Sequence, residues 1–166
     1  LVVLAGGHGV AAHGVLAYPP AVTEAMVRTI VAGRAGVSAL AREHGVQDIV
    51  RFAGRQPQNE LKWFYGAADV FVLATAFEGW ANVFLEAMAC GLPVVTTRVG
   101  GNAEVIVDRS LGELVDWWNA AVFRDAIDRA LRADWDRNAI IAHARANTWD
   151  ERIERLIEEL RDSSVA

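Results

Sequence analysis

The sequence predicts an α/β domain in which a parallel sheet carries helices on both faces. Short segments rich in β-branched residues alternate along the chain with longer segments of helical pattern. Four of the short segments are apolar runs with little polar interruption, which is typical of strands that are buried on both faces. This alternation indicates βαβ units, whose right-handed crossovers place the strands in one parallel sheet.

The strands are expected where β-branched runs end at glycines or polar turns. Leu-Val-Val-Leu-Ala at the start of the chain precedes two glycines, and Asp-Ile-Val-Arg-Phe-Ala follows later. Val-Phe-Val-Leu-Ala and Pro-Val-Val-Thr-Thr-Arg-Val have the same character, and a fifth run is weaker. The predicted strands are residues 1–5, 48–53, 70–74, 93–99 and 112–115. Together they predict a Rossmann-like sheet.

Helical patterns fill the segments between and after these strands. Gly33 and Gly36 interrupt the first helical segment, which could therefore form two helices. Gly91 and Pro93 follow the third, as expected for a glycine that ends a helix and a proline that cannot continue it. The predicted helices are residues 21–43, 59–67, 82–90, 103–107, 118–131 and 149–160.

The last predicted helix, residues 149–160, is strongly amphipathic. Its charged residues fall on one face, and its other face has an apolar stripe formed by Trp149, Ile153, Leu156, Ile157 and Leu160. A helix with such a stripe usually packs it against an apolar surface. We therefore expect this helix to be docked.

Length and composition favour one compact domain and exclude several classes of partner. The chain has 166 residues, 53% of them hydrophobic and 22% charged, which suits a single folded core. Its net charge is −5 and it has no run of Lys or Arg, so we expect no nucleic-acid partner. No apolar stretch approaches the roughly 20 residues that span a bilayer.

The single cysteine, Cys90, excludes an internal disulfide and fits a reducing cytosol. The start of the chain lacks the basic region of a signal peptide, so the prediction is a cytoplasmic protein. Cys90 is interpreted as a small packing residue near a helix end. Trp135 is likewise expected to pack in the core or at the edge of the domain.

The chemistry is expected in the segment from Glu78 to Glu86, at the carboxyl edge of the sheet. A strand ends near Ala74, Glu78 and Gly79 follow in a short loop, and a helix begins near Asn82. Open α/β sheets bind ligands at this edge. Unpaired N–H groups and the helix dipole favour an anion such as a diphosphate, and Gly79 lets the backbone approach it.

The two carboxylates of this segment are expected to serve one ligand. Glu78 precedes the helix, whereas Glu86 lies about one turn inside it. Helical side chains lean toward the helix N-terminus, so Glu86 can reach toward the region that Glu78 lines. Two acceptors near an anion-binding helix end suit the vicinal hydroxyls of a ribose and of a hexose.

At these residues the sequence resembles the family-4 glycosyltransferases of the GT-B superfamily. The resemblance rests on their Glu-x7-Glu motif, which is Glu78-Gly-Trp-Ala-Asn-Val-Phe-Leu-Glu86 here. The continuation Ala-Met-Ala-Cys-Gly-Leu-Pro-Val-Val and the later Val-Gly-Gly-Asn-Ala-Glu are also similar. The resemblance implies that the chain is a nucleotide-sugar-binding domain, one half of a GT-B fold.

The resemblance also implies a role for each site residue. Glu78 would contact the donor sugar as a positioning and charge-stabilising group, and Glu86 would bind the ribose hydroxyls. The donor would further contact Gly79, Trp80, Ala81 and Asn82, and Arg55 and Gln56 would lie beside its base. The family transfers a sugar from a nucleotide donor with retention of configuration and needs no catalytic metal. We therefore expect no cofactor besides the nucleotide-sugar co-substrate.

Two departures from the family pattern qualify these expectations. Many members have Pro or Gly where this chain has Ala81. The family's domain also begins with a strand and helix whose Gly-Arg and Lys bind the diphosphate, and this sequence starts after them, at Leu1. The N-terminal acceptor domain is the expected partner and is absent as well. We therefore expect residues 1–166 to bind nucleotides weakly and to transfer nothing.

Other interpretations stay open. A non-catalytic nucleotide-sugar-binding or interaction module is one alternative, and half of a sugar-nucleotide epimerase is another. The pattern Gly7-His-Gly-Val-Ala-Ala12 matches a dinucleotide-binding turn, but no clear helix follows it, which favours a loop at the edge of the cleft. A membrane-associated acceptor would place the full-length protein at the inner face of the membrane, although the chain has no basic amphipathic patch to support this.

Overall fold

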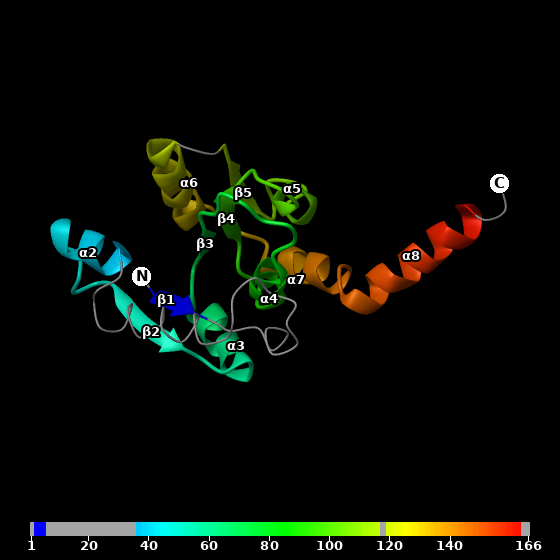
Figure 1. Ribbon diagram of the computed structural model, residues 1–166, viewed down its shortest axis with the longest axis horizontal. Coiled ribbons are helices and arrows are strands. Elements are labelled where there is room, and N and C mark those ends of the chain that lie inside the picture. Colours follow the sequence, from blue (N-terminus) through cyan, green and yellow to red (C-terminus); the bar gives the residue numbers. More distant parts are fainter. Residues whose placement is uncertain (1, 6–35, 117–118, 164–166) are drawn as a thin grey trace. The chain divides into compact units, whose positions relative to one another are not determined.

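The computed structural model describes residues 2–5, 36–116 and 119–163, in two compact units that divide after Leu61 (Figure 1). The first unit has a two-stranded parallel sheet, in which Val2 pairs with Arg51 and Ala5 with Arg55. Its elements are β1 (Val2–Ala5), α2 (Gly36–Glu43) and β2 (Arg51–Arg55), and α3 (Gln58–Ala67) crosses the boundary between the units.

Two predictions about the first unit can be compared with the structure only in part. Helix α2 begins at Gly36, one of the two glycines expected to interrupt the segment 21–43. The rest of that segment and the pattern Gly7–Ala12 lie outside the described residues. Strand β2 lies two to three residues later than the predicted strand 48–53.

The second unit is built on three parallel strands in the order β3-β4-β5. Phe71 of β3 pairs with Val94 of β4, which in turn pairs with Gly112 of β5. The central strand β4 is buried along its whole length, as its apolar run predicts. The strands are β3 (Phe71–Leu73), β4 (Val94–Thr97) and β5 (Gly112–Val115).

Helices cover both faces of this sheet, which confirms the prediction (Figure 1). The side chains of β4 alternate, so that Val94 faces one cluster of buried apolar residues and Val95 faces another. The first cluster includes residues of α4 (Asn82–Ala89), α5 (Asn102–Val105) and α7 (Arg137–Arg145). The second includes Ala126 and Ala130 of α6 (Ala120–Arg132). Trp135 packs against both clusters, as expected of a core residue.

Helix α7 is absent from the sequence-based prediction. Only Ile140 and Ala144 of this helix are buried, so its apolar pattern is too sparse to indicate a helix. Asp136 caps it by accepting hydrogen bonds from the backbone N–H groups of Asn138 and Ala139, both at 3.0 Å. The ring Nε2 of His143 lies 2.9 Å from the carbonyl oxygen of Val105, which ties α7 to α5.

Helix α8 (Trp149–Ser163) confirms the last predicted helix, but the described residues do not cover its apolar stripe. The five apolar side chains of the stripe are between 42% and 64% exposed. The expected docking is therefore not found within the part of the chain that the structure describes. The guanidinium of Arg155 links α8 to the end of α7, because it donates to the carbonyl oxygen of Ala146 at 2.8 Å.

Candidate functional site

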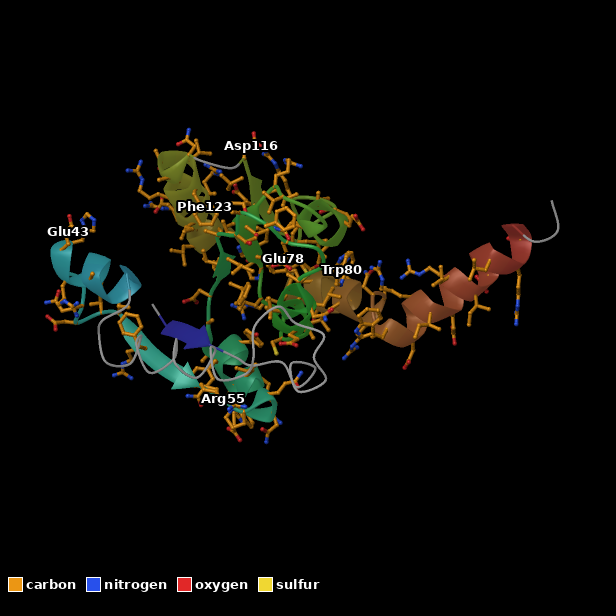
Figure 2. All side chains as sticks on the ribbon, viewed as in Figure 1. Glu43, Arg55, Glu78, Trp80, Asp116 and Phe123 are labelled. Atoms are coloured by element: carbon orange, nitrogen blue, oxygen red, sulfur yellow. The ribbon has the colours of Figure 1, made fainter. Side chains whose placement is uncertain are left out.

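The candidate site is the loop between β3 and α4, at the carboxyl end of the parallel sheet. Strand β3 ends at Leu73, and α4 begins at Asn82 as predicted. Glu78 lies in this loop and is half-buried, whereas Gly79 and Asn82 are exposed. Figure 2 shows Glu78 and Trp80 on the loop that leads into α4. The sequence motif is thus placed where ligands bind in open α/β sheets.

The backbone N–H groups in the first turn of α4 have no side-chain acceptor at the N-cap position. The cap residue is Ala81, which has extended dihedral angles (φ −85°, ψ 94°) suited to an N-cap but no side-chain oxygen. The amide of Phe84 donates to the carbonyl oxygen of Ala81 at 3.0 Å. The other N–H groups of the first turn and the positive end of the helix dipole remain suited to an anion.

The loop that carries Glu78 packs directly against the backbone of Gly100 and Gly101. The amide of Gly101 donates to the carbonyl oxygen of Gly79 at 3.0 Å. A Cβ at Gly100 would lie 1.6 Å from the carbonyl oxygen of Glu78, and one at Gly101 would lie 2.1 Å from that of Gly79. Only glycine allows the two segments to approach this closely. The Gly-Gly pair therefore supports the loop.

Two threonine hydroxyls of β4 form hydrogen bonds with the backbone at the start of the same loop. The hydroxyl of Thr97 accepts from the amide of Thr75 at 3.2 Å and donates to the carbonyl oxygen of Thr75. The hydroxyl of Thr96 donates to the carbonyl oxygen of Leu73 at 2.7 Å. These threonines were not predicted from the sequence, because an apolar strand pattern does not show which hydroxyls reach a neighbouring strand.

Asn102 extends this network to α5 and is fully buried. Its Nδ2 donates to the carbonyl oxygen of Thr97 at 2.8 Å and to the hydroxyl of Thr96 at 3.2 Å. Its Oδ1 is buried and has no hydrogen-bond partner among the described residues. Because Gly100 and Gly101 directly precede it, Asn102 fixes the turn that supports Glu78.

Glu86 is on α4 and is half-buried. It lies next to Tyr65, a residue that no sequence motif marks. The hydroxyl of Tyr65 lies 3.4 Å from Oε2 of Glu86 and donates to it. Burial, and after it the Glu86 carboxylate, raise the pKa of Tyr65 to about 12. The pair joins α3 to α4 within the second unit.

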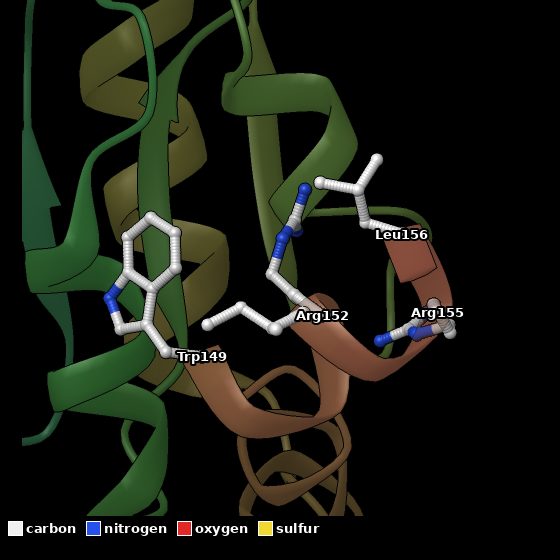
Figure 3. A pocket seen from close by; sticks show the side chains of 5 residues that line it. Trp149, Arg152, Arg155 and Leu156 are labelled. Carbon is white, nitrogen blue, oxygen red and sulfur yellow. The ribbon is translucent and has the colours of Figure 1, made fainter. Parts of the chain in front are cut away.

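Trp80, which is expected to contact the donor, already has a partner on one face of its ring. The guanidinium of Arg152 on α8 lies 3.8 Å from the centre of the Trp80 ring, a cation–π contact. The half-buried ring also packs against the first apolar cluster. Arg152 lines a surface pocket of about 390 Å³ together with Trp149, Ile153, Arg155 and Leu156 (Figure 3).

Arg55 and Gln56 belong to the first unit. Arg55 is the last residue of β2 and is exposed. The Gln56 amide donates to the carbonyl oxygen of Ala53, which fixes its side chain at the end of that strand. Their place beside the base of a donor stays a prediction.

The described residues contain no group of three or more His, Cys, Asp or Glu side chains that could hold a metal ion. Burial raises the pKa of Cys90, which does not favour a reactive thiolate. No helix in residues 2–5, 36–116 or 119–163 combines the length and apolar character needed to cross a membrane.

A second pocket, of about 500 Å³, lies at the carboxyl ends of the strands on the α6 side of the sheet. Ala74 and Thr97 line it from the sheet, and Phe123 and Ile127 line it from α6. It is mostly apolar, and neither Glu78 nor Glu86 lines it. The pocket is therefore separate from the candidate site, which comprises the loop and the N-terminus of α4.

The fold defines the class of protein, because solved glycosyltransferases have a similar fold. Sucrose-phosphate synthase from Thermosynechococcus elongatus matches with a TM-score of 0.66 and 28% identity, over 80% of this chain and 35% of that one. WaaG, a glycosyltransferase involved in lipopolysaccharide biosynthesis, matches with a TM-score of 0.57 and 30% identity, over 69% of this chain and 31% of that one. These likenesses confirm the predicted GT-B fold.

Residues 17–147 match the family of glycosyl transferases group 1, and the chain belongs to this family. A D-inositol 3-phosphate glycosyltransferase from Acidothermus cellulolyticus is 40% identical over 129 residues, which is 75% of this chain and 29% of that protein. Another from Thermomonospora curvata is 35% identical over 151 residues, which is 84% of this chain and 35% of that protein. The chain thus spans about a third of the length of these relatives.

Proposed function

We propose that this chain is the donor-binding domain of a retaining glycosyltransferase. The full-length enzyme would transfer a sugar from a UDP- or GDP-linked donor to a glycan, lipid or small-molecule acceptor. One observation carries the proposal: Glu78 lies on a loop supported by Gly100 and Gly101, directly before the open N-terminus of α4. This arrangement combines an anion site with a carboxylate that can accept hydrogen bonds from a sugar.

Each group in this arrangement has a distinct task in the proposed reaction. The first-turn N–H groups of α4, with the helix dipole, stabilise the donor diphosphate as negative charge grows on it. Glu78 orients the donor sugar through its hydroxyls and stabilises the positive charge that develops on the ring. Glu86 accepts hydrogen bonds from the ribose, and the departing diphosphate assists attack of the acceptor on the same face.

The remaining partners in the proposal come from outside this chain. The acceptor and the catalytic base would be bound by an N-terminal domain of the same protein. The relatives are named for D-inositol 3-phosphate, which makes this compound the first acceptor to test. The proposed reaction uses no metal and no cofactor besides the nucleotide-sugar, in the cytoplasm or at the inner face of the membrane.

Kinetics of the full-length protein test the proposal through two substitutions. Glu86→Ala should raise the KM for the donor by about ten-fold or more, because the ribose loses hydrogen bonds to a charged group. Glu78→Ala should mainly lower kcat, by roughly 100-fold, because its interaction is strongest in the transition state. Asp69→Ala is the matched control, because Asp69 is an exposed carboxylate just before β3, at the opposite edge of the sheet.

Calorimetry with UDP, GDP and ADP separates this proposal from a non-catalytic module. Binding of one nucleotide, weakened by Glu86→Ala, supports a donor site. If no nucleotide binds to the full-length protein, or if both glutamate variants keep the kinetics of the Asp69→Ala control, the donor-site proposal is wrong and an interaction module is the better account.

A further inference from the structure

The side chain of Tyr65 is fixed by aromatic neighbours in the second unit. It is 6% exposed, and its ring packs edge-on against Phe71 with centroids 5.8 Å apart. Phe71 packs edge-on against Phe84 of α4, with centroids 6.1 Å apart. This row of rings joins α3, β3 and α4, and it determines the direction in which the Tyr65 hydroxyl points.

The hydroxyl at the end of this row reaches Glu86. It lies 3.4 Å from Oε2, a long separation for an O–H···O hydrogen bond, so it orients the carboxylate rather than anchoring it tightly. Burial and the Glu86 carboxylate raise the pKa of Tyr65 to about 12, so the phenol keeps its proton at neutral pH. The phenol O–H is therefore the donor of the hydrogen bond, and the carboxylate oxygen of Glu86 accepts it.

We propose that Tyr65 is a positioning residue for the donor: its hydroxyl engages one oxygen of Glu86 and leaves the other to accept from the ribose diol. This inference rests on the proposed function of Glu86. A glutamate side chain has three rotatable bonds, and fixing it only when the ligand binds would weaken binding. A partner that favours this orientation of the carboxylate beforehand removes part of this cost.

The test uses Tyr65→Phe in the full-length protein, because this substitution keeps the ring row and removes only the hydroxyl. The affinities for UDP, GDP and ADP are measured, together with the donor KM and kcat. We expect the affinity of the preferred nucleotide to fall about three- to ten-fold, with a matching rise in KM and little change in kcat. A fall in kcat alone, or no change in affinity, would overturn the inference.

A ligand-side control separates positioning from a general loss of packing. The 2′-deoxy forms of the same nucleoside diphosphates lack one of the two hydroxyls that Glu86 would bind. Because one hydroxyl remains for Glu86, Tyr65→Phe should weaken the binding of the deoxy forms less than the binding of the ribo forms. If Tyr65→Phe weakens the deoxy and ribo forms equally, the hydroxyl acts on folding or packing and not on the ribose.

A double-mutant cycle with Glu86→Ala completes the test. Once Glu86 is removed, Tyr65→Phe should have no further effect on nucleotide affinity. An effect of the same size in both backgrounds would overturn the positioning role. If Glu86→Ala weakens binding and Tyr65→Phe does not, only the inference about Tyr65 fails. If Glu86→Ala itself changes nothing, the proposed function of Glu86 fails with it.

Discussion

Helices α4 and α7 pack against each other in the same core but differ at their N-termini. The N-cap of α7 is Asp136, whose carboxylate accepts from two backbone amides. The N-cap of α6, on the other face, is Asn119, whose side chain accepts from the amide of Val122 at 3.1 Å. The N-cap of α4 is Ala81, which has no polar side-chain atom.

A helix N-terminus can have two different roles, depending on whether a side chain caps it. A capped end satisfies its N–H groups within the protein and contributes to stability alone. An end without a side-chain cap lacks that stabilisation, and its N–H groups are free to bind water or an anionic ligand. In α4 the approach of the chain is fixed instead by backbone contacts with Gly100 and Gly101. The three predictions below test this division of roles.

The largest effect is expected from Gly100→Ala, which disturbs the backbone contact that supports the loop before α4. Gly100 has a φ of 48°, where a Cβ costs about 1–2 kcal/mol. The new Cβ would also meet the carbonyl oxygen of Glu78 at 1.6 Å, and moving that backbone should cost about 1–3 kcal/mol more. We expect the free energy of unfolding, measured with urea, to fall by about 3 kcal/mol, and donor affinity to fall with it.

Gly91→Ala is the matched control for this prediction. Gly91 also has a positive φ, of 75°, but its nearest neighbour would be the Cβ of Arg137 at 3.1 Å. Because the main cost there is backbone strain, the free energy of unfolding should fall by about 1–2 kcal/mol, with no change in donor affinity. Equal losses for the two variants would show that the loop is not held by the close backbone contact.

Much of the fold could be predicted from the sequence, because strands and large helices have strong apolar patterns. The buried strand β4 and the helix α4 with its following Gly91 are examples. Helix α7 could not be predicted, since two buried residues leave little periodicity. The exposed stripe of α8 shows a further limit: an amphipathic pattern indicates which face favours burial but not what covers it.

Only the local part of the candidate site could be predicted from the sequence. The motif from Glu78 to Glu86 is contiguous, so its loop and helix follow from local signals. Tyr65, Thr97 and Asn102 reach it from other elements, and nothing near them in the sequence marks the contact. A tyrosine in an amphipathic helix looks like any core residue until the fold brings a carboxylate to its hydroxyl.

A smaller effect is expected from Asp136→Ala, which removes the cap of α7. Two backbone amides lose their acceptor, and the free energy of unfolding should fall by about 1 kcal/mol. Donor affinity should not change, because this end has no ligand role. Asp134→Ala, at an exposed aspartate just before the cap, controls for the loss of a negative charge and should be neutral. Weaker nucleotide binding by Asp136→Ala alone would contradict the division between capped and open ends.

The smallest effect on stability is expected from Ala81→Ser, which should instead lower the affinity for nucleotide. The dihedral angles of Ala81 already suit an N-cap, so the new hydroxyl can accept from the amide of Val83. The free energy of unfolding should rise by a few tenths of a kcal/mol, because the gain from capping is partly offset by burial of a polar group.

The same hydroxyl would compete with the donor for the open end of α4. Nucleotide affinity, measured by calorimetry on the full-length protein, should therefore fall about three- to ten-fold while stability holds or rises. Ala87→Ser is the matched control, because Ala87 is a fully buried alanine within the same helix, away from its N-terminus. That variant should lose stability and keep its nucleotide affinity. If Ala81→Ser binds nucleotide as well as the parent does, the first-turn N–H groups of α4 do not hold the diphosphate, and the missing side-chain cap has no functional meaning.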